Sequence, residues 1–104
     1  MLSEKIPYYA VIFTSKQTGD LKGYTKMSDY MVALAKEQPG FLKVDSARQS
    51  VGITISYWES LEAISSWKQN AEHVLAQKLG KQKWYSWYNV RICKVEREYE
   101  FNAN

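Results

Sequence analysis

The segment YYAVIFTSK, Tyr8 to Lys16, constrains the fold of this chain more than any other stretch. It follows Pro7 and is rich in β-branched and aromatic residues, which favour a β-strand. Neighbouring side chains on a strand point to opposite faces. Here both faces are apolar, one with Tyr8, Ala10 and Ile12, the other with Tyr9, Val11 and Phe13. A sheet built on this strand must be covered on both sides, because soluble proteins rarely leave a large apolar surface in water.

Five further elements follow this strand. Apolar residues at helical spacing predict a helix over 24–38, which Pro39 and Gly40 end. Next comes a hairpin of two short strands, over residues 41–48 and 52–58. A second helical stretch over 58–77 precedes Gly80, and a long last strand follows over 84–101. The order β-α-β-β-α-β is typical of the ferredoxin-like split sandwich, an α+β fold with an antiparallel sheet. Because such crossovers are right-handed, both helices should lie on one face of the sheet.

Two helices on one face leave the other face of the sheet uncovered. The last strand is also apolar on both sides, with Val90 and Ile92 opposite Trp87, Cys93 and Val95. A monomer would leave much of one apolar face in water. We therefore expect a homodimer in which two sheets pack face to face.

The length of 104 residues fits a single domain, 1–104, with a core over about 8–101. The net charge is +3 and the basic residues do not cluster, so we expect no nucleic-acid partner. Cys93 is the only cysteine, which excludes an intramolecular disulfide and fits a reducing compartment. The start MLSEKIPYY lacks a signal-peptide pattern and no apolar run approaches a membrane span, so we expect a cytoplasmic protein without membrane association.

The second helical stretch contains Trp67 and the only histidine, His73. In an unbroken helix, six residues correspond to a rotation of about 240°, which points His73 away from Trp67 and leaves it a surface residue. Asn70, however, is a residue type that caps helices, and a break there would let His73 turn back toward Trp67. The sequence leaves both arrangements open.

Several short motifs resemble the antibiotic biosynthesis monooxygenase domain, over about residues 8–101. They are the strand–helix–hairpin order, PGF before the second strand, YWES at the end of the third, and Trp67 six residues before His73. The resemblance implies a dimeric ferredoxin-like α+β barrel with a pocket between helices and sheet in each subunit. Characterised members of that family include cofactor-independent oxygenases that act on polyphenolic or quinol-type substrates.

Oxygenation without a metal or flavin needs an electron-rich substrate anion that can itself pass an electron to O₂. The protein must then bind an aromatic ring, assist deprotonation and hold the anion away from water. His73 is the side chain suited to act as a base near neutral pH, with Trp67 beside it as the second candidate catalytic residue. The candidate ligand-binding residues are Phe13, Tyr30 and Tyr88 as ring-binding walls and Asn89 or Arg91 as holders of an oxyanion. Tyr30 and Tyr88 can also be read as core or interface residues, and Arg91 as a paired charge.

A second branch of the resembled family degrades haem, and this chain fits that branch less well. The branch places an Asn on its first strand, where this chain has Thr14, and its haem-binding His lies further beyond the Trp than His73 does here. One His and one Cys cannot form a zinc site without carboxylates, and no glycine-rich phosphate loop follows a strand. We therefore expect no cofactor and no metal, with haem as the disfavoured alternative.

The sequence thus favours a small monooxygenase that acts without a cofactor on an aromatic or quinol-type substrate. One alternative is a non-catalytic dimeric module that binds a hydrophobic ligand or partner, for which Trp67 would matter and His73 would not. Another is a purely structural role, in which Tyr30 and Trp67 fill the space between helices and sheet.

Overall fold

The computed structural model describes residues 2–19, 21–78 and 84–103, except for the side chains of 73–78. In chain order the elements are η1 (Ser3–Lys5), β1 (Tyr8–Gln17), α1 (Tyr24–Lys36), β2 (Phe41–Arg48), β3 (Gly52–Trp58), α2 (Leu61–Lys78) and β4 (Tyr85–Val95). Apart from the short 3-10 helix η1, this is the predicted order. Within the described residues no helix is both long and apolar enough to cross a membrane.

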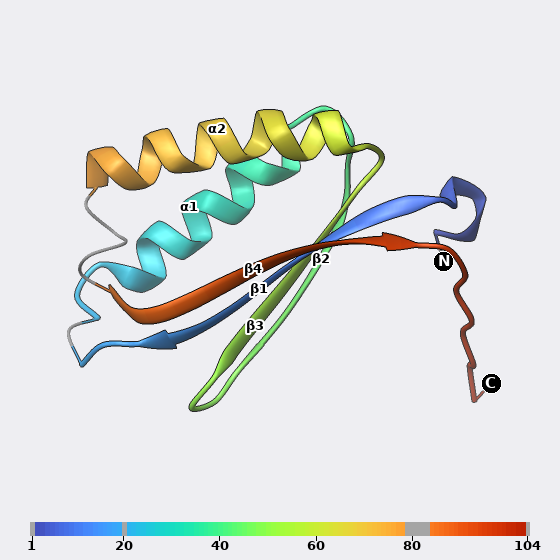
Figure 1. Cartoon of the computed structure of the whole chain (residues 1–104). Coiled ribbons are helices and arrows are strands. Elements are labelled where there is room, and N and C mark those ends of the chain that lie inside the picture. The colour runs from blue at the N-terminus through green and yellow to red at the C-terminus, as the bar shows by residue number, and fades with distance from the viewer. Residues whose placement is uncertain (1, 20, 79–83, 104) are drawn as a thin grey trace.

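The four strands form one sheet in the order β2-β3-β1-β4, and every neighbouring pair is antiparallel. Figure 1 shows α1 and α2 on the same side of this sheet. This arrangement confirms the predicted α+β split sandwich with both helices on one face.

The residues of β1 divide between the two faces as the alternation predicts. Tyr9 and Val11 pack on the helix side against Ala35 of α1, Trp58 at the end of β3 and Ile64 of α2. The intervening residues Tyr8, Ala10 and Ile12 therefore point to the opposite side, here called the open face. A residue of β3 or β4 that pairs with a β1 residue points to the same face of the sheet as that residue. The register of the strands therefore gives the face of each paired residue.

The start of α2 is positioned by the turn that follows α1. Gly40 in this turn has a left-handed φ of +86°, and a side-chain carbon added to it would come within 2.6 Å of the Cβ of Ala63. The hydroxyl of Ser60 accepts a hydrogen bond from the backbone N–H of Ala63 at 3.1 Å and so caps the helix. Two local features thus fix where α2 begins and how closely its first turn approaches the turn after α1.

The last strand is shorter than the predicted 84–101, because β4 ends at Val95, which pairs with Tyr8 at the start of β1. Beyond that point β1 offers no further partner, since Pro7 has no backbone N–H to donate. Residues 96–103 form an extended arm that leads away from the helices (Figure 1). Tyr99 and Phe101 on this arm are 83% and 87% exposed.

Candidate functional site

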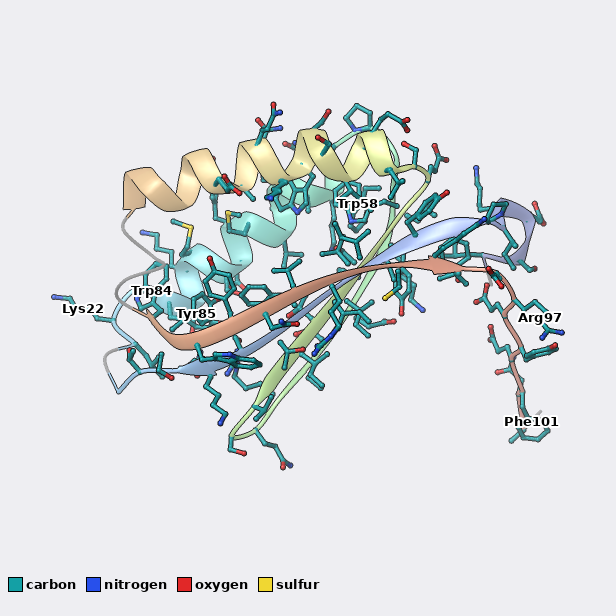
Figure 2. All side chains as sticks on the ribbon, in the orientation of Figure 1. Lys22, Trp58, Trp84, Tyr85, Arg97 and Phe101 are labelled. Atoms are coloured by element: carbon teal, nitrogen blue, oxygen red, sulfur yellow. The ribbon has the colours of Figure 1, made fainter. Side chains whose placement is uncertain are left out.

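One end of the helix–sheet interface is filled by stacked aromatic rings. Trp58 is fully buried, and its ring stacks on Trp67 of α2 with centroids 5.9 Å apart. Phe41 meets Trp58 edge-on at 5.5 Å, and the indole N–H of Trp58 donates to the hydroxyl of Ser56 over 2.9 Å. Figure 2 shows Trp58 beneath the first turns of α2. Trp67 is therefore packed against the core at this end of the molecule.

At the other end, rings from β1, β4 and α1 form a second group, here called the tyrosine cluster: Phe13, Tyr24, Tyr85 and Tyr88. Phe13 stacks on Tyr88 with centroids 5.4 Å apart and meets Tyr85 edge-on at the same distance. Tyr85 in turn meets Tyr24, the first residue of α1, at 6.0 Å. Figure 2 shows Tyr85 on this side of the sheet, far along β4 from the arm.

The tyrosine cluster opens to solvent along β4. Tyr88 is 39% exposed, and Val90 and Ile92, which alternate with it and share its face, are 48% and 52% exposed. The helices therefore leave the helix side of β4 accessible. A flat aromatic molecule could stack beside Tyr88 and cover these two aliphatic side chains.

The phenol of Tyr85 is held in its neutral form. Burial raises the pKa of Tyr85 above its ordinary value, and a hydrogen bond with Tyr24 raises that pKa further. The charge of Arg48 acts in the opposite direction and lowers the pKa in part. Since the net shift is upward, the hydroxyl of Tyr85 can donate or accept hydrogen bonds at neutral pH but cannot serve there as a base.

Arg48 reaches the helix side of β1 across the neighbouring strand. In the strand register, Arg48 at the end of β2 pairs with Gly52 of β3, which pairs with Ser15 of β1. The guanidinium donates a hydrogen bond to the hydroxyl of Ser15, which is fully buried. A side chain at position 52 would overlap this guanidinium, so the glycine provides the gap through which Arg48 passes.

Sequence reasoning missed Arg48 and Tyr85 as site residues. The available signal for Arg48 was the predicted hairpin of 41–48 and 52–58, whose simplest register places Gly52 opposite it. To recognise the contact of Arg48 with β1, one must also know which residue of β1 pairs with Gly52. Local sequence does not reveal a pairing between strands so far apart in the chain.

The predicted oxyanion holders lie on the other side of the sheet. Asn89 pairs with Thr14 and Arg91 with Ile12, so both share the open face with these two residues. The Oδ1 atom of Asn89 is buried and has no hydrogen-bond partner among the described residues. Thr14, the position compared with the Asn of the haem branch, also points away from the helices. The described residues of β1 therefore offer no support for a haem site between helices and sheet.

The remaining sequence-predicted residues lie on the two helices. Tyr30 of α1 is 52% exposed and so does not fill the space beneath the helices. The helix α2 runs unbroken from Leu61 to Lys78, and Asn70 lies within it, where its amide donates to the side-chain oxygen of Gln38 over 3.0 Å. The break that would turn His73 toward Trp67 is thus absent. The side chain of His73 lies outside the described residues.

Two surface hollows lie apart from these aromatic groups. One of about 350 Å³ is lined by the turn after α1 and the first turns of α2, including Gly40 and Ala63. The other, of about 240 Å³, lies at the chain ends, lined by Leu2, Tyr8, Lys43, Tyr57, Glu98 and Glu100. Among the residues whose positions are described, no three His, Cys, Asp or Glu side chains gather closely enough to hold a metal ion.

Several solved structures are similar to this chain in fold, and a different protein is similar to it in sequence. A mutant of SnoaB, a cofactor-independent oxygenase from Streptomyces nogalater, matches with a TM-score of 0.73 and 10% identity over 88% of this chain and 96% of that chain. A dimeric ferredoxin-like protein from an uncultured marine organism matches with a TM-score of 0.70 and 12% identity over 94% of this chain and 96% of that chain. At these identities the likeness establishes the ferredoxin-like fold alone.

No family model matches the chain. In sequence, it is 46% identical over 100 residues to the uncharacterized protein YqjZ of Bacillus subtilis. The match covers 94% of this chain and 88% of YqjZ. The chain therefore belongs to the same protein family as YqjZ.

Proposed function

We propose that the protein is a cofactor-independent monooxygenase for an aromatic or quinol-type substrate, which binds on the helix side of β4. The observation that carries this proposal is the solvent-open aromatic wall, where Phe13 stacks on Tyr88 beside the exposed side chains of Val90 and Ile92. A planar substrate would stack on the same wall and cover apolar surface that is otherwise in water. The fold shared with the oxygenase SnoaB is consistent with this function.

The chemistry needs little from the protein beyond binding and proton transfer. A doubly benzylic CH₂ or a hydroquinone hydroxyl loses a proton, and the resulting anion, which is delocalised onto a carbon that still carries a hydrogen, gives an electron to O₂. Combination of the two radicals and protonation give a hydroperoxide, which loses water to leave a carbonyl. One oxygen atom enters the substrate, the other leaves as water, and the substrate supplies all the electrons. The protein accelerates these steps by orienting the ring and by stabilising the anion.

We assign the proton transfer to His73 because histidine is the residue type of this chain that changes charge near neutral pH; with α2 unbroken, it would act from a different face of that helix than the one that carries Trp67. Tyrosine and arginine, the ionisable types in and beside the tyrosine cluster, normally change charge far above neutral pH, so the cluster itself provides no base. His73 lies in the second half of α2, the half that runs toward the start of β4 (Figure 1). In this proposal Trp67 supports the site through its stacking on Trp58.

Oxygen consumption with a panel of hydroquinones and anthrones tests the proposal. We expect turnover by the wild type, a loss of roughly 10²–10⁴-fold in kcat for His73→Ala, as for removal of a general base, and a weaker effect for Tyr88→Ala, mainly on KM. Tyr99→Ala is the matched control, because this ring is 83% exposed on the arm. An absence of oxygen uptake by the wild type across the panel would contradict the proposal.

A non-catalytic binding module is the second candidate. It is favoured by the absence of a near-neutral base among the described residues of the tyrosine cluster, since a binding site needs the aromatic wall and no base. Quenching of tryptophan emission by the same compounds, with no oxygen uptake and with equal affinity in His73→Ala, would establish this alternative.

We also infer that the protein is a homodimer that buries the open face of its sheet. Ile53 and Trp87 on this face are 43% and 44% exposed, and no helix covers them within the described chain. The marine structure of the same fold is a dimeric protein, which is consistent with this inference.

A further inference from the structure

We propose that the ligand of the tyrosine cluster is an aromatic carboxylate, and that Arg48 recognises its charge. The proposal names the ligand class of the site described above, and it rests on the proposed function only for the location of that ligand. Whether the bound compound is also oxidised does not enter the argument.

Two contacts hold the side chain of Arg48 in a fixed position. Its guanidinium lies over Gly52, where any side chain would displace it, and donates to the hydroxyl of Ser15. Ser15 is fully buried and takes up one of the five N–H groups that a guanidinium carries. A long side chain that is fixed in this way loses little further entropy when it binds a ligand.

The charge of Arg48 is not neutralised by a carboxylate of the described chain. The ion pairs among described residues join Lys5 to Glu59, Lys43 to Asp45 and Lys68 to Glu72, and each is largely exposed to water. Arg48 is half-buried, and Ser15 is its side-chain partner. A half-buried cation with free N–H groups favours an anion more strongly than an exposed one, because water screens it less.

The same charge lies next to the aromatic wall. The guanidinium donates to Ser15, which pairs with Tyr88 in the register of β1 and β4, and the charge of Arg48 also lowers the pKa of Tyr85 against the larger upward shift caused by burial. Tyr85 contacts Phe13 and Tyr88 at 5.4 and 6.0 Å. A ring stacked beside Tyr88 would therefore have a cation near one edge. The planar fork of a guanidinium matches a carboxylate on that edge through two parallel hydrogen bonds.

Titration calorimetry with a matched pair of ligands tests this inference. The pair is a hydroxynaphthoate and the corresponding hydroxynaphthamide, which have the same ring and nearly the same shape but differ by one negative charge. The wild type should bind the acid at least about tenfold more tightly than the amide, as a charge-assisted hydrogen bond implies. Added salt should weaken binding of the acid and leave that of the amide unchanged.

Two variants locate the effect. Arg48→Gln should bind acid and amide with equal affinity, and its retained binding of the amide shows that the site is still folded. Arg97→Gln is the matched control, because Arg97 is an exposed arginine on the arm (Figure 2), and it should keep the preference of the wild type.

The outcomes separate this inference from the proposed function. Equal binding of acid and amide by the wild type, or a preference that survives in Arg48→Gln, overturns the role of Arg48 and leaves the aromatic site standing. Binding of neither compound by the wild type overturns the aromatic site itself, and the inference falls with it. If Arg48→Gln fails to fold, equal binding of acid and amide by the wild type still overturns the inference.

Discussion

Tyr8 is almost fully buried although it points to the face of the sheet that carries no helix. It is 3% exposed, because its ring meets Tyr57 edge-on at 5.9 Å and its hydroxyl donates to Glu98 over 3.0 Å. Burial, and secondly the hydrogen bond to Glu98, raise the pKa of Tyr8 from 10.0 to about 12. The folded protein thus holds this proton more tightly than the unfolded chain does.

Stability should therefore fall at high pH in a way that depends on Tyr8. The contribution is fully present below pH 10.0, the unfolded value, and is lost as the pH rises toward the folded value of about 12. In urea denaturation at a series of pH values, Tyr8→Phe should lose stability less steeply than the wild type in this window. At neutral pH the same variant should be less stable by about 1 kcal/mol, because the bond to Glu98 is gone.

Tyr99→Phe serves as the control for this prediction, since Tyr99 is 83% exposed. The stability of this variant should depend on pH in the same way as that of the wild type. Identical slopes for Tyr8→Phe and the wild type above pH 10.0 would contradict the assigned role of Tyr8.

The contact between the α1–β2 turn and α2 positions the first turn of that helix. Gly40→Ala would place a side chain in a left-handed conformation and 2.6 Å from the Cβ of Ala63. We expect this variant to lose about 2–3 kcal/mol of stability, from backbone strain and overpacking together. Gly19→Ala is the matched control, because nothing lies within 4 Å of the added carbon, and it should cost no stability. Equal urea midpoints for the two variants would show that this turn does not constrain α2.

The same helix illustrates what the sequence could predict and what it could not. The sequence predicted a helical stretch over 58–77, and α2 runs over Leu61–Lys78 with Ile64 in the core and Trp67 packed against it. Asn70 left a break open, since its residue type suits a cap. In the structure the helix continues through Asn70, and the amide of Asn70 donates to the side chain of Gln38, 32 positions away in the chain. Local sequence does not contain that partner.

Strand pairing limited the site predictions in the same way. Phe13 and Tyr88 were both predicted to line the ligand site, and they are in contact because β1 and β4 are neighbours. Asn89 and Arg91 were predicted from the same strand, yet they occupy the open face. The face of a strand residue depends on register, and a shift of one residue reverses it. Arg48 was missed because its significance arises only from three strands together.

At the scale of the whole molecule, the two faces of the sheet are unequally protected. The helix side buries Trp58, Ala35 and Ile64 and leaves apolar side chains exposed along β4, whereas no helix of the described chain covers the open face, on which Ile53 and Trp87 are exposed. The arm beyond Val95 adds two more exposed rings, and Figure 1 shows it turning away from the helices, toward the side of the open face. This much apolar surface on one side is typical of a protein that is covered by a partner.

A second copy of the chain is the partner we expect, and the oligomeric state in solution tests this. Sedimentation velocity at micromolar concentration should give twice the mass of one chain for the wild type. Ile53→Glu places a charge on the open face near the hairpin end of β3, where a second sheet would bury it without compensation, and association should weaken by at least about tenfold. Leu61→Glu is the matched control, because Leu61 is 52% exposed at the start of α2 and lies on the helix side, where the added charge should leave the dimer intact. A wild type that sediments as a single chain, or a dimer that Ile53→Glu does not weaken, would mean that the open face is covered by something other than a second sheet.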